Sequence, residues 1–452
     1  MNGNILFLLL FVLTCGIIGY GVFSTKKAIS LNNETWLMKF WKKENVKVIA
    51  ASLISIIMGM FIGCVLLLVF AGATTGGMKN CWDAMQLVIA GPFNTGRNGN
   101  ATLIFGWNGT NIGNVLFNAT PVILTGLSVA LAFKTGLFNI GAPGQYLMGT
   151  ATTLIVALSI PTTAVPAFLV WTLAFLAGII AGALWGAIPG FFKAYLNVNE
   201  VITCIMTNWI AANLVTAVFD NNTGIFKHLL DPSGTKNWAY VYKTTHNGVE
   251  TSKLFLDKIF PGSQVNGGII VAIVIAILVH IVLNKTTFGY ELKSCGSNRN
   301  AAKYAGINEK RSIIYSMMIA GGLAGAGAAL YYLSGNTEFY WATYQSLPAI
   351  GFNGIPVALL ATNSPIGVIF SASFMAYLDV AGMQMKYMTS YNEYITGIIS
   401  AVIVYFSAFS LLFSQVLNGK IKLFKKKADK AIELRTITDS NVKETELKED
   451  NE

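Results

Sequence analysis

The sequence predicts an all-α polytopic membrane protein of about 10–11 transmembrane helices, arranged as a 5+5 repeat with discontinuous helices. Hydrophobic residues make up 54% of the chain, charged residues only 12%, and the mean hydropathy is +0.57. The apolar residues gather in segments close to the roughly 20 residues with which a helix crosses a ~30 Å hydrocarbon core. These segments are Ile5–Phe23, Val46–Ala71, Asn114–Phe133, Gly144–Ile160, Val165–Phe192, Glu200–Phe219, Gly267–Leu283, Ser312–Leu333, Leu347–Ala361, Ile366–Gly382 and Asn392–Phe413.

The first segment could be a signal peptide or a retained helix. Met1–Asn4 carries no Lys or Arg, and Ile5–Phe23 is longer than the apolar region of a usual signal peptide. Lys26 and Lys27 follow it directly. We therefore expect residues 1–45 to form an N-terminal transmembrane helix with its N-terminus outside, followed by a cytoplasmic loop.

The net charge of +10 comes from basic loops between the spans. Lys and Arg concentrate in residues 24–47, 284–311 and 420–427, where the positive-inside rule places them on the cytoplasmic side. With alternating spans, residues 72–113 and 220–266 then fall outside. No basic patch interleaved with aromatics lies between the spans, so we expect no nucleic-acid partner. We expect a transmembrane domain over 46–415 and a charged cytoplasmic tail over 416–452, whose composition opposes folding.

Ten spans remain after the first and divide five plus five around residues 220–266, which is the basis of the repeat prediction. Small residues recur at four-residue spacing in Gly178, Gly182, Gly186 and Gly190, and again in Gly321 and Gly325. Because lipid gives helices no hydrophobic reason to associate, such residues promote close backbone packing. The ladder fits packing inside the bundle or contact with a second transmembrane subunit.

Glycines and a proline interrupt the apolar pattern between Lys134 and Gln145. Gly136, Gly141 and Gly144 are expected to break the helix, and Asn139 and Gln145 lie beside the break. Irregular backbone at membrane depth is tolerated only when it is buried in protein or lines a wet cavity. The stretch is therefore either part of a substrate pathway, with its amides facing a polar solute, or a tight cytoplasmic turn between two spans.

The stretch from Asn197 to Trp209 opens the next span. Asn199 is suited to cap that helix, and Glu200 in the first turn suits the positive end of the helix dipole. Capping explains both residues. It does not explain Asn208, two turns deeper, which we place in the substrate pathway.

The basic loop 284–311 contains a short run that favours a helix. Ala301–Ala305 is expected to be capped by Asn298 or Asn300 and ended by Gly306. Its small side chains and charged flanks suit a groove on a cytoplasmic partner, although a simple surface loop fits as well. The residues assigned to this coupling loop are Asn298, Ala301, Ala302, Lys303, Tyr304, Ala305, Gly306 and Ile307.

A second Gly/Pro-interrupted segment lies in the other half of the chain, at Gly351–Leu360. Gly351 and Gly354 are expected to break the helix, and paired interruptions of this kind point to a transport pathway. We therefore add Asn353 and the intramembrane Asp379 to the pathway residues, since ionisable groups within spans are functional candidates. Asp379 also lies close enough to a span end to reach the interface.

Motifs for enzymatic chemistry are absent from the sequence. There is no Walker A sequence, no HExxH, no GxSxG, and no metal-binding spacing among the five cysteines and three histidines. The chain therefore carries no P-loop ATPase of its own, and we expect no enzyme activity, no catalytic residues, no metal and no cofactor.

Together the four interrupted or polar stretches resemble the permease subunits of ABC importers for nucleosides, within the superfamily that also holds ribose-type and branched-chain amino-acid permeases. The resemblance covers roughly Val46 to Phe413 and is most specific in Gly136–Gln145, Asn199–Ile202, Phe288–Ile307 and Gly351–Leu360. It implies a bacterial plasma-membrane protein with three partners: a second related permease, a cytoplasmic ATPase with two fused nucleotide-binding domains, and an extracytoplasmic lipoprotein that delivers nucleoside. It also implies that the ATPase binds Asn298–Ile307.

Two other functions remain open from the sequence. An ABC permease could carry a simple sugar such as ribose or a branched-chain amino acid. A secondary carrier driven by ion gradients would need buried carboxylates or unwound ion sites, and Asp379 and the break at Gly141–Gly144 are all that the chain offers.

Overall fold

The computed structural model describes residues 44–71, 77–220, 223–229, 238–239, 249–342, 345–392 and 394–408. The first predicted span, most of residues 1–45, the tail over 416–452 and part of residues 220–266 lie outside these ranges. The helices are α3 (Glu44–Ala71), α4 (Gly77–Ala90), α5 (Gly109–Lys134), α6 (Ala142–Ser159), α7 (Ala167–Leu196), α8 (Glu200–Phe219), α9 (Leu256–Ile259), α10 (Gly268–Lys285), α11 (Thr287–Ser297), α12 (Arg299–Tyr304), α13 (Glu309–Tyr332), α14 (Ala349–Leu360), α15 (Pro365–Met388) and α16 (Tyr394–Ala408).

Short strands and single 3-10 turns complete the described secondary structure. Strands β1 (Asn94–Arg97) and β2 (Leu103–Phe105) form an antiparallel hairpin in which Arg97 pairs with Leu103, with a bulge between Asn94 and Gly96. Strands β3 (Trp238–Ala239) and β4 (Phe339–Tyr340) pair antiparallel across a long sequence separation. The 3-10 turns are η1 (Gly91–Phe93) and η2 (Lys227–Leu229).

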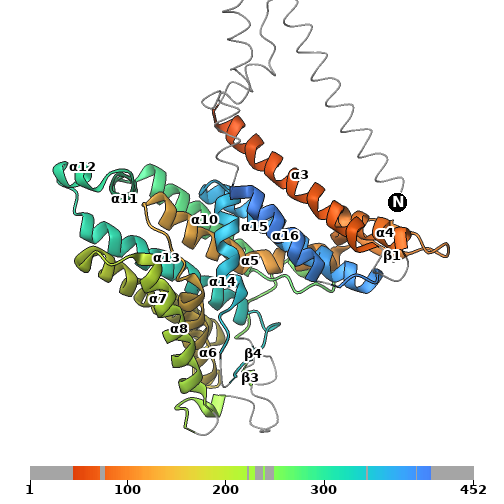
Figure 1. The fold of residues 1–452 in the computed structure, drawn as a ribbon. Helices are drawn as coiled ribbons and strands as arrows, with labels where there is room; N and C mark the ends of the chain where they lie inside the picture. Colours follow the sequence, from red (N-terminus) through yellow and green to blue (C-terminus); the bar gives the residue numbers. More distant parts are fainter. Residues whose placement is uncertain are drawn as a thin grey trace, which may run out of the picture.

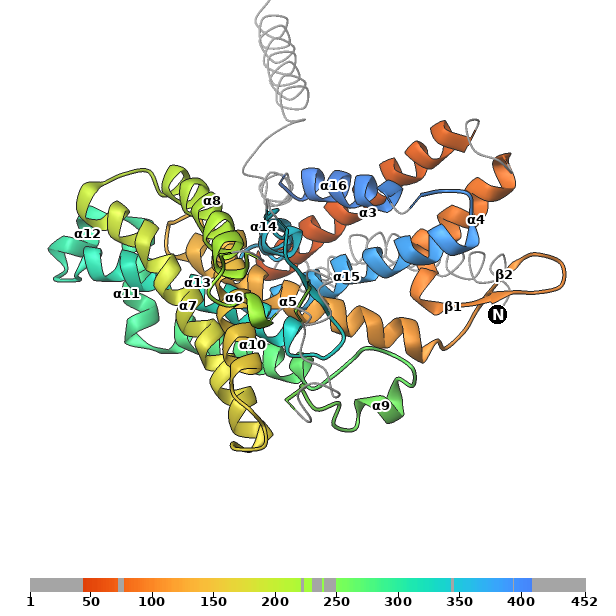
Figure 2. The ribbon, with the colours of Figure 1, turned by 90° about the horizontal axis from the view of Figure 1, so that it is seen from below.

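The helices form a bundle with two distinct ends. Helices α11 and α12 project at one end, and α4 with the β1–β2 hairpin lies at the opposite end (Figures 1 and 2). We call these the α12 end and the hairpin end. Helix α5 runs from the hairpin end toward α11, and α15 returns to the hairpin end beside α4 (Figure 2).

Helices α5 and α13 form the interior of the bundle. In their most apolar windows 89% of α5 residues and 78% of α13 residues are buried, against 22% for α7 and 33% for α10. The exposed side chains of α7 are nonetheless large and apolar, including Phe168, Ile180 and Leu184. A surface of this composition is stable against lipid tails and not against water. The protein is therefore a multi-pass membrane protein with α7 and α10 at its periphery.

Helices α7 and α13 form the most extensive helix pair, along a seam of glycines. A Cβ atom at Gly182 would overlap the carbonyl oxygen of Gly321, and one at Gly325 would overlap the carbonyl oxygen of Gly178. The backbones therefore touch directly, as small residues permit in membranes. The interpretation of the glycine ladder as packing inside the bundle is confirmed.

Ten of the eleven predicted segments coincide with helices, but not all of these are full spans. Six described helices are long and apolar enough to cross a membrane: α5, α7, α8, α10, α13 and α15. The predicted span Leu347–Ala361 is wrong in length, because α14 has 12 residues and rises only about 18 Å. Helix α4 was missed, since it lies in the segment 72–113 that was expected to be a connection. The 5+5 repeat stays a prediction.

Candidate functional site

The first predicted helix break is a tight connection between α5 and α6. Helix α5 ends at Lys134, Gly136 has a φ of +70°, and Gly141 precedes the first residue of α6. A Cβ atom at Gly136 would also lie 2.6 Å from the Cα atom of Gly296 at the end of α11. Glycine is needed there both for the left-handed backbone and for the close approach.

Three amide side chains close this connection into a buried network, which we call the amide knot: Asn139, Gln145 and Asn208. Their exposed fractions are 0%, 1% and 2%. The Nδ2 of Asn139 donates to the Oε1 of Gln145 at 2.8 Å, and the Nε2 of Gln145 donates back to the Oδ1 of Asn139 at 3.0 Å. The amide groups therefore satisfy each other.

The amide knot also fixes the backbone around it. The Oδ1 of Asn139 accepts from the backbone N–H of Gly141, and its Nδ2 donates to the Oγ of Ser128 on α5 at 2.9 Å. From α8, Asn208 accepts from the N–H of Gly144 at 2.9 Å and donates to the carbonyl of Ile140 at 3.0 Å. These bonds replace the helical ladder that the connection interrupts. The amides thus connect α5, α6 and α8 through hydrogen bonds to protein groups, and their place in a substrate pathway stays a prediction.

The cap predicted for α8 is confirmed. The Oδ1 of Asn199 accepts from the backbone N–H of Val201 at 2.9 Å, and Glu200 follows in the first turn. Glu200 also forms an ion pair with Lys193 near the end of α7, with 2.9 Å between Nζ and Oε2. Both residues are explained by local structure at this corner.

The second predicted break is not present, because α14 is continuous through Gly351 and Gly354. Gly144 likewise lies inside α6. The glycines serve close packing instead. A Cβ atom at Gly351 would lie 2.5 Å from the Cα atom of Pro143, at the start of α6. The first turn of α14 therefore packs directly against the N-terminus of α6.

A cavity of about 390 Å³ lies on the other side of α14, between helices α5, α13, α14, α15 and α16. We call it the polar cavity. The sequence prediction placed Asn353 and Asp379 in the substrate pathway, and both line this cavity. Its volume is in the range of small-molecule sites in proteins. The full lining is Asn118, Pro121, Val122, Tyr331, Ile350, Asn353, Asp379, Met383, Tyr394 and Gly397.

The polar cavity holds side chains whose hydrogen-bonding capacity is unused. Among the described residues, the side chains of Asn118, Asn353 and Asp379 have no hydrogen-bond or ion-pair partner. Asn118 lies nine residues after Gly109 on α5, and Asp379 lies nine residues before Met388 on α15. At 1.5 Å per residue both lie about 14 Å from the hairpin end, a distance of about half the ~30 Å thickness of a hydrocarbon core. An ionisable side chain within a membrane helix is a candidate for function, and Asp379 therefore stays one.

Sequence reasoning missed Asn118, Tyr331 and Tyr394. A signal for Asn118 exists in the sequence: Asn111, Asn114 and Asn118 recur at three- and four-residue spacing and so share one face of α5. The tyrosines carry no comparable signal, because a single aromatic residue in an apolar segment is indistinguishable from lipid-facing or core packing.

The predicted coupling loop forms a helix pair at the α12 end (Figure 1). Asn298 caps α12 by accepting from the N–H of Ala301 at 3.1 Å, and Gly306 follows the helix with a φ of +81°. Both the cap and the end residue agree with the sequence prediction. Ala302 is 3% exposed and faces the protein, whereas Tyr304 is 94% exposed. The loop therefore presents a large aromatic side chain on a short capped helix.

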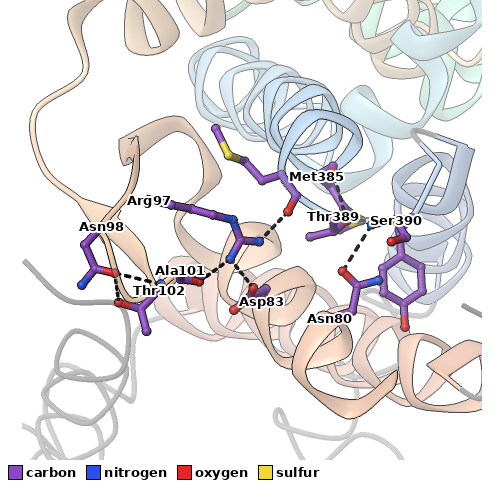
Figure 3. Close-up of polar contacts among 11 residues, drawn as sticks. Asn80, Asp83, Arg97, Asn98, Ala101, Thr102, Met385, Thr389 and Ser390 are labelled. Atoms are coloured by element: carbon purple, nitrogen blue, oxygen red, sulfur yellow. Dashed lines mark hydrogen bonds and ion pairs between the residues drawn. The ribbon is translucent and has the colours of Figure 1, made fainter. Parts of the chain in front are cut away.

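At the hairpin end, Arg97 connects the hairpin to two helices, a feature that the sequence did not predict. Its guanidinium lies 2.8 Å from the carboxylate of Asp83 on α4 and donates to the carbonyls of Ala101 and Met388 (Figure 3). The side chain of Asp83 is only 10% exposed. A shielded ion pair with additional hydrogen bonds fixes geometry well. The hairpin is thus held against the end of α15.

Comparison with known proteins shows the family. Residues 111–408 match the model of the branched-chain amino acid transport system / permease component family. The chain is 33% identical over 370 residues to the guanosine ABC transporter permease protein NupP of Bacillus subtilis (strain 168), covering 82% of this chain and 95% of that protein. It is 34% identical over 385 residues to the nucleoside ABC transporter permease protein NupB of Lactococcus lactis subsp. cremoris (strain MG1363), covering 84% and 97%.

Other relatives match a smaller share of the chain. The glucose ABC transporter permease protein TsgB13 of Haloferax volcanii is 32% identical over 309 residues, covering 68% of this chain and 78% of that protein. A second guanosine permease of Bacillus subtilis, NupQ, is 28% identical over 263 residues, covering 58% and 78%. No solved structure matches the chain significantly. The family match and the likeness to NupP and NupB show that the chain is a transporter subunit and belongs to the branched-chain amino acid transport system permease component family.

Proposed function

We propose that this chain is the transmembrane permease subunit of an ABC importer for nucleosides. The observation that carries this proposal is the likeness to NupP and NupB, which extends over at least 95% of each relative's length and more than four fifths of this chain. The family match over residues 111–408 includes most of α5 and all of α11, α12, α13, α14 and α15. The glucose permease is matched over a smaller share of both chains.

The proposed route for the nucleoside runs through the polar cavity. Three observations support it: two polar residues of the cavity lie about 14 Å from the hairpin end, its amides and carboxylate have no partner among the described residues, and its walls come from five different helices. Relative movement of those helices would open the cavity toward one side of the membrane at a time. The amide knot, in contrast, belongs to the scaffold that holds α5, α6 and α8 at one side of α14.

The energy would come from a separate cytoplasmic ATPase that binds the α12 end. Tyr304 and the rest of α12 project from the bundle and are suited to a groove on that subunit (Figure 1). Closing of the ATPase would then move α11 and α13, which continue from α12 on either side. On this assignment the α12 end is cytoplasmic, and the hairpin end faces the extracytoplasmic lipoprotein that delivers the nucleoside.

A second, related permease would complete the transporter. Bacillus subtilis has two guanosine ABC transporter permease proteins, NupP and NupQ, and this chain is more similar to NupP than to NupQ. We therefore assign this chain to the NupP-like position and propose a NupQ-like partner, with one ATPase carrying two fused nucleotide-binding domains.

Uptake in cells that lack this subunit tests the proposal. Re-expression of the chain should restore uptake of radiolabelled nucleoside, and excess unlabelled nucleosides should compete, whereas ribose, glucose and leucine should not. Depleting ATP while maintaining the ion gradients should stop uptake. Competition by a sugar alone would favour the sugar permease, and uptake that persists without ATP would favour an ion-coupled carrier.

The role of α12 has its own test. Replacing Tyr304 with Ala removes an exposed side chain and leaves the buried Ala302 in place, so insertion should be unchanged. We expect nucleoside uptake to fall about tenfold if this side chain anchors the ATPase, as interface aromatics commonly do. Phe370→Ala is the matched control, because Phe370 is an aromatic residue that is 72% exposed in the first half of α15, and it belongs neither to α12 nor to the hairpin end. Equal uptake in both variants would exclude Tyr304 as an anchor.

A further inference from the structure

The wall of the polar cavity has a distinct electrostatic character. Its lining includes one carboxylate, Asp379, and none of its lining residues is Lys, Arg or His. Two amides, Asn118 and Asn353, and two phenols, Tyr331 and Tyr394, supply the remaining polar groups. An anionic solute would therefore face a negative charge without a neighbouring cation, in a region where water screens charges poorly. The cavity is suited to an uncharged solute that offers hydrogen-bond donors.

The carboxylate of Asp379 has unused acceptor capacity. An ionised carboxylate accepts hydrogen bonds at two oxygens and donates none. Asp379 is exposed to the cavity and has no partner among the described residues. Two adjacent hydroxyl groups on one ring present two O–H donors at a spacing that one carboxylate can accept together. The 2′- and 3′-hydroxyls of ribose form such a pair, and acidic side chains recognise ribose hydroxyls in other nucleotide-binding folds.

We propose that Asp379 recognises the vicinal hydroxyls of ribose, so that the polar cavity selects ribonucleosides over their deoxy analogues during translocation. This inference rests on the proposed nucleoside route and adds the group that reads the sugar. The amides of Asn118 and Asn353 each carry both donors and an acceptor, as the edges of nucleobases do. The ring of Tyr394 is 72% exposed and offers a face on which a base can stack, whereas the ring of Tyr331 already stacks on Phe117. The ribose is the part that all ribonucleosides share, and its hydroxyls are the groups that would bond the Asp379 carboxylate.

The test compares two solutes in one transporter. The complete importer, with its lipoprotein and ATPase, is reconstituted in vesicles, and initial uptake of a ribonucleoside and of its 2′,3′-dideoxy analogue is measured at concentrations that saturate the lipoprotein. The variant is Asp379→Asn, which keeps the size of the side chain and removes its charge. Asp257→Asn is the matched control, since Asp257 is an exposed carboxylate on α9 that does not line the cavity.

We expect Asp379→Asn to lower ribonucleoside uptake about tenfold and dideoxynucleoside uptake less than about twofold, because charged hydrogen bonds to the hydroxyls are lost only for the first solute. Asp257→Asn should change neither. A second variant, Asp379→Glu, keeps the charge but moves it by one methylene group, and should also lower ribonucleoside uptake selectively. It provides the same comparison if the Asn variant assembles poorly.

The outcomes separate this inference from the proposed function. An equal loss for both solutes, or no loss for either, overturns the assignment of Asp379 and leaves the nucleoside importer standing. If the unmodified importer takes up neither solute with ATP, the proposed function fails, and the inference fails with it.

Discussion

The amide knot and the polar cavity use the same side-chain chemistry for opposite purposes. In the amide knot, the side chains of Asn139 and Gln145 form hydrogen bonds with each other, and Asn139 also bonds nearby protein groups. In the polar cavity, Asn353 and Asp379 have no partner among the described residues. The knot lies at one face of α14 and the cavity at the other. The two regions thus differ in whether their polar side chains are paired, and the unpaired ones are the candidates for the proposed route.

The largest effect should follow removal of Asn139. Replacing Asn139 with Ala leaves both polar atoms of Gln145 and the N–H of Gly141 buried without partners. Each such group costs about 1–3 kcal/mol, so we expect a loss of about 3 kcal/mol or more in the free energy of unfolding. The midpoint of thermal denaturation in detergent measures it. Asn213→Ala is the control, because Asn213 is exposed and, in the part of the chain that the structure describes, its side chain bonds only the carbonyl of Trp209 on its own helix.

A stable Asn139→Ala protein that transports poorly would reverse the comparison. It would mean that Asn139 acts on the solute after all, as the sequence prediction supposed. The knot would then have to open during the transport cycle.

The next effect concerns Gly144, where α6 contacts the third member of the knot. A Cβ atom at Gly144 would lie 2.7 Å from the Oδ1 and 2.8 Å from the Cα atom of Asn208. Gly144→Ala should therefore push α8 away and break both hydrogen bonds of Asn208, at a cost of about 2 kcal/mol. The same thermal measurement applies. A double variant with Asn208→Ala should lose less than the sum of the two single losses, because both changes break the same bonds.

Replacing Asn353 should affect transport more than stability, in contrast to Asn139 and Gly144. Asn353→Ala removes no hydrogen bond among the described residues, so we expect a change in unfolding free energy within about 0.5 kcal/mol. Nucleoside uptake should nevertheless fall about threefold to tenfold, since one polar wall of the route is lost. Thermal stability and uptake are measured on the same preparation. A destabilised variant with normal uptake would place Asn353 in the scaffold.

Local features of the fold were predictable from the sequence. The caps by Asn199 and Asn298 and the helix end at Gly306 depend on a few neighbouring residues, and all three are present. The connection at Gly136 was also recognisable, because glycine is the residue that most readily adopts the left-handed backbone conformation found there. The positions of the apolar helices were predictable from hydropathy, because the apolar character of a segment is a property of that segment alone.

The distinction between knot and cavity was not predictable. Asn139 and Asn353 lie beside similar glycines, and only contacts between distant segments decide which amide is paired. The hydrogen bond from Arg97 to the carbonyl of Met388 and the contact of Gly351 with Pro143 likewise join residues far apart in the chain. Gly351 and Gly354 looked like a helix break because glycine permits both a break and a close approach. Hydropathy contains no information on which of these occurs.

The smallest effect is expected at Gly397, the glycine of the cavity wall. A Cβ atom there meets nothing within 4 Å, in contrast to Gly144. Because Gly397 lies inside α16, Gly397→Ala should stabilise the helix by up to about 1 kcal/mol. The added methyl group enters the polar cavity, so uptake should fall by about twofold or less, and a bulkier Gly397→Leu should block it further. Thermal midpoints and initial uptake rates across the Gly, Ala and Leu series would show stability and transport moving in opposite directions, which a scaffold glycine such as Gly144 cannot produce.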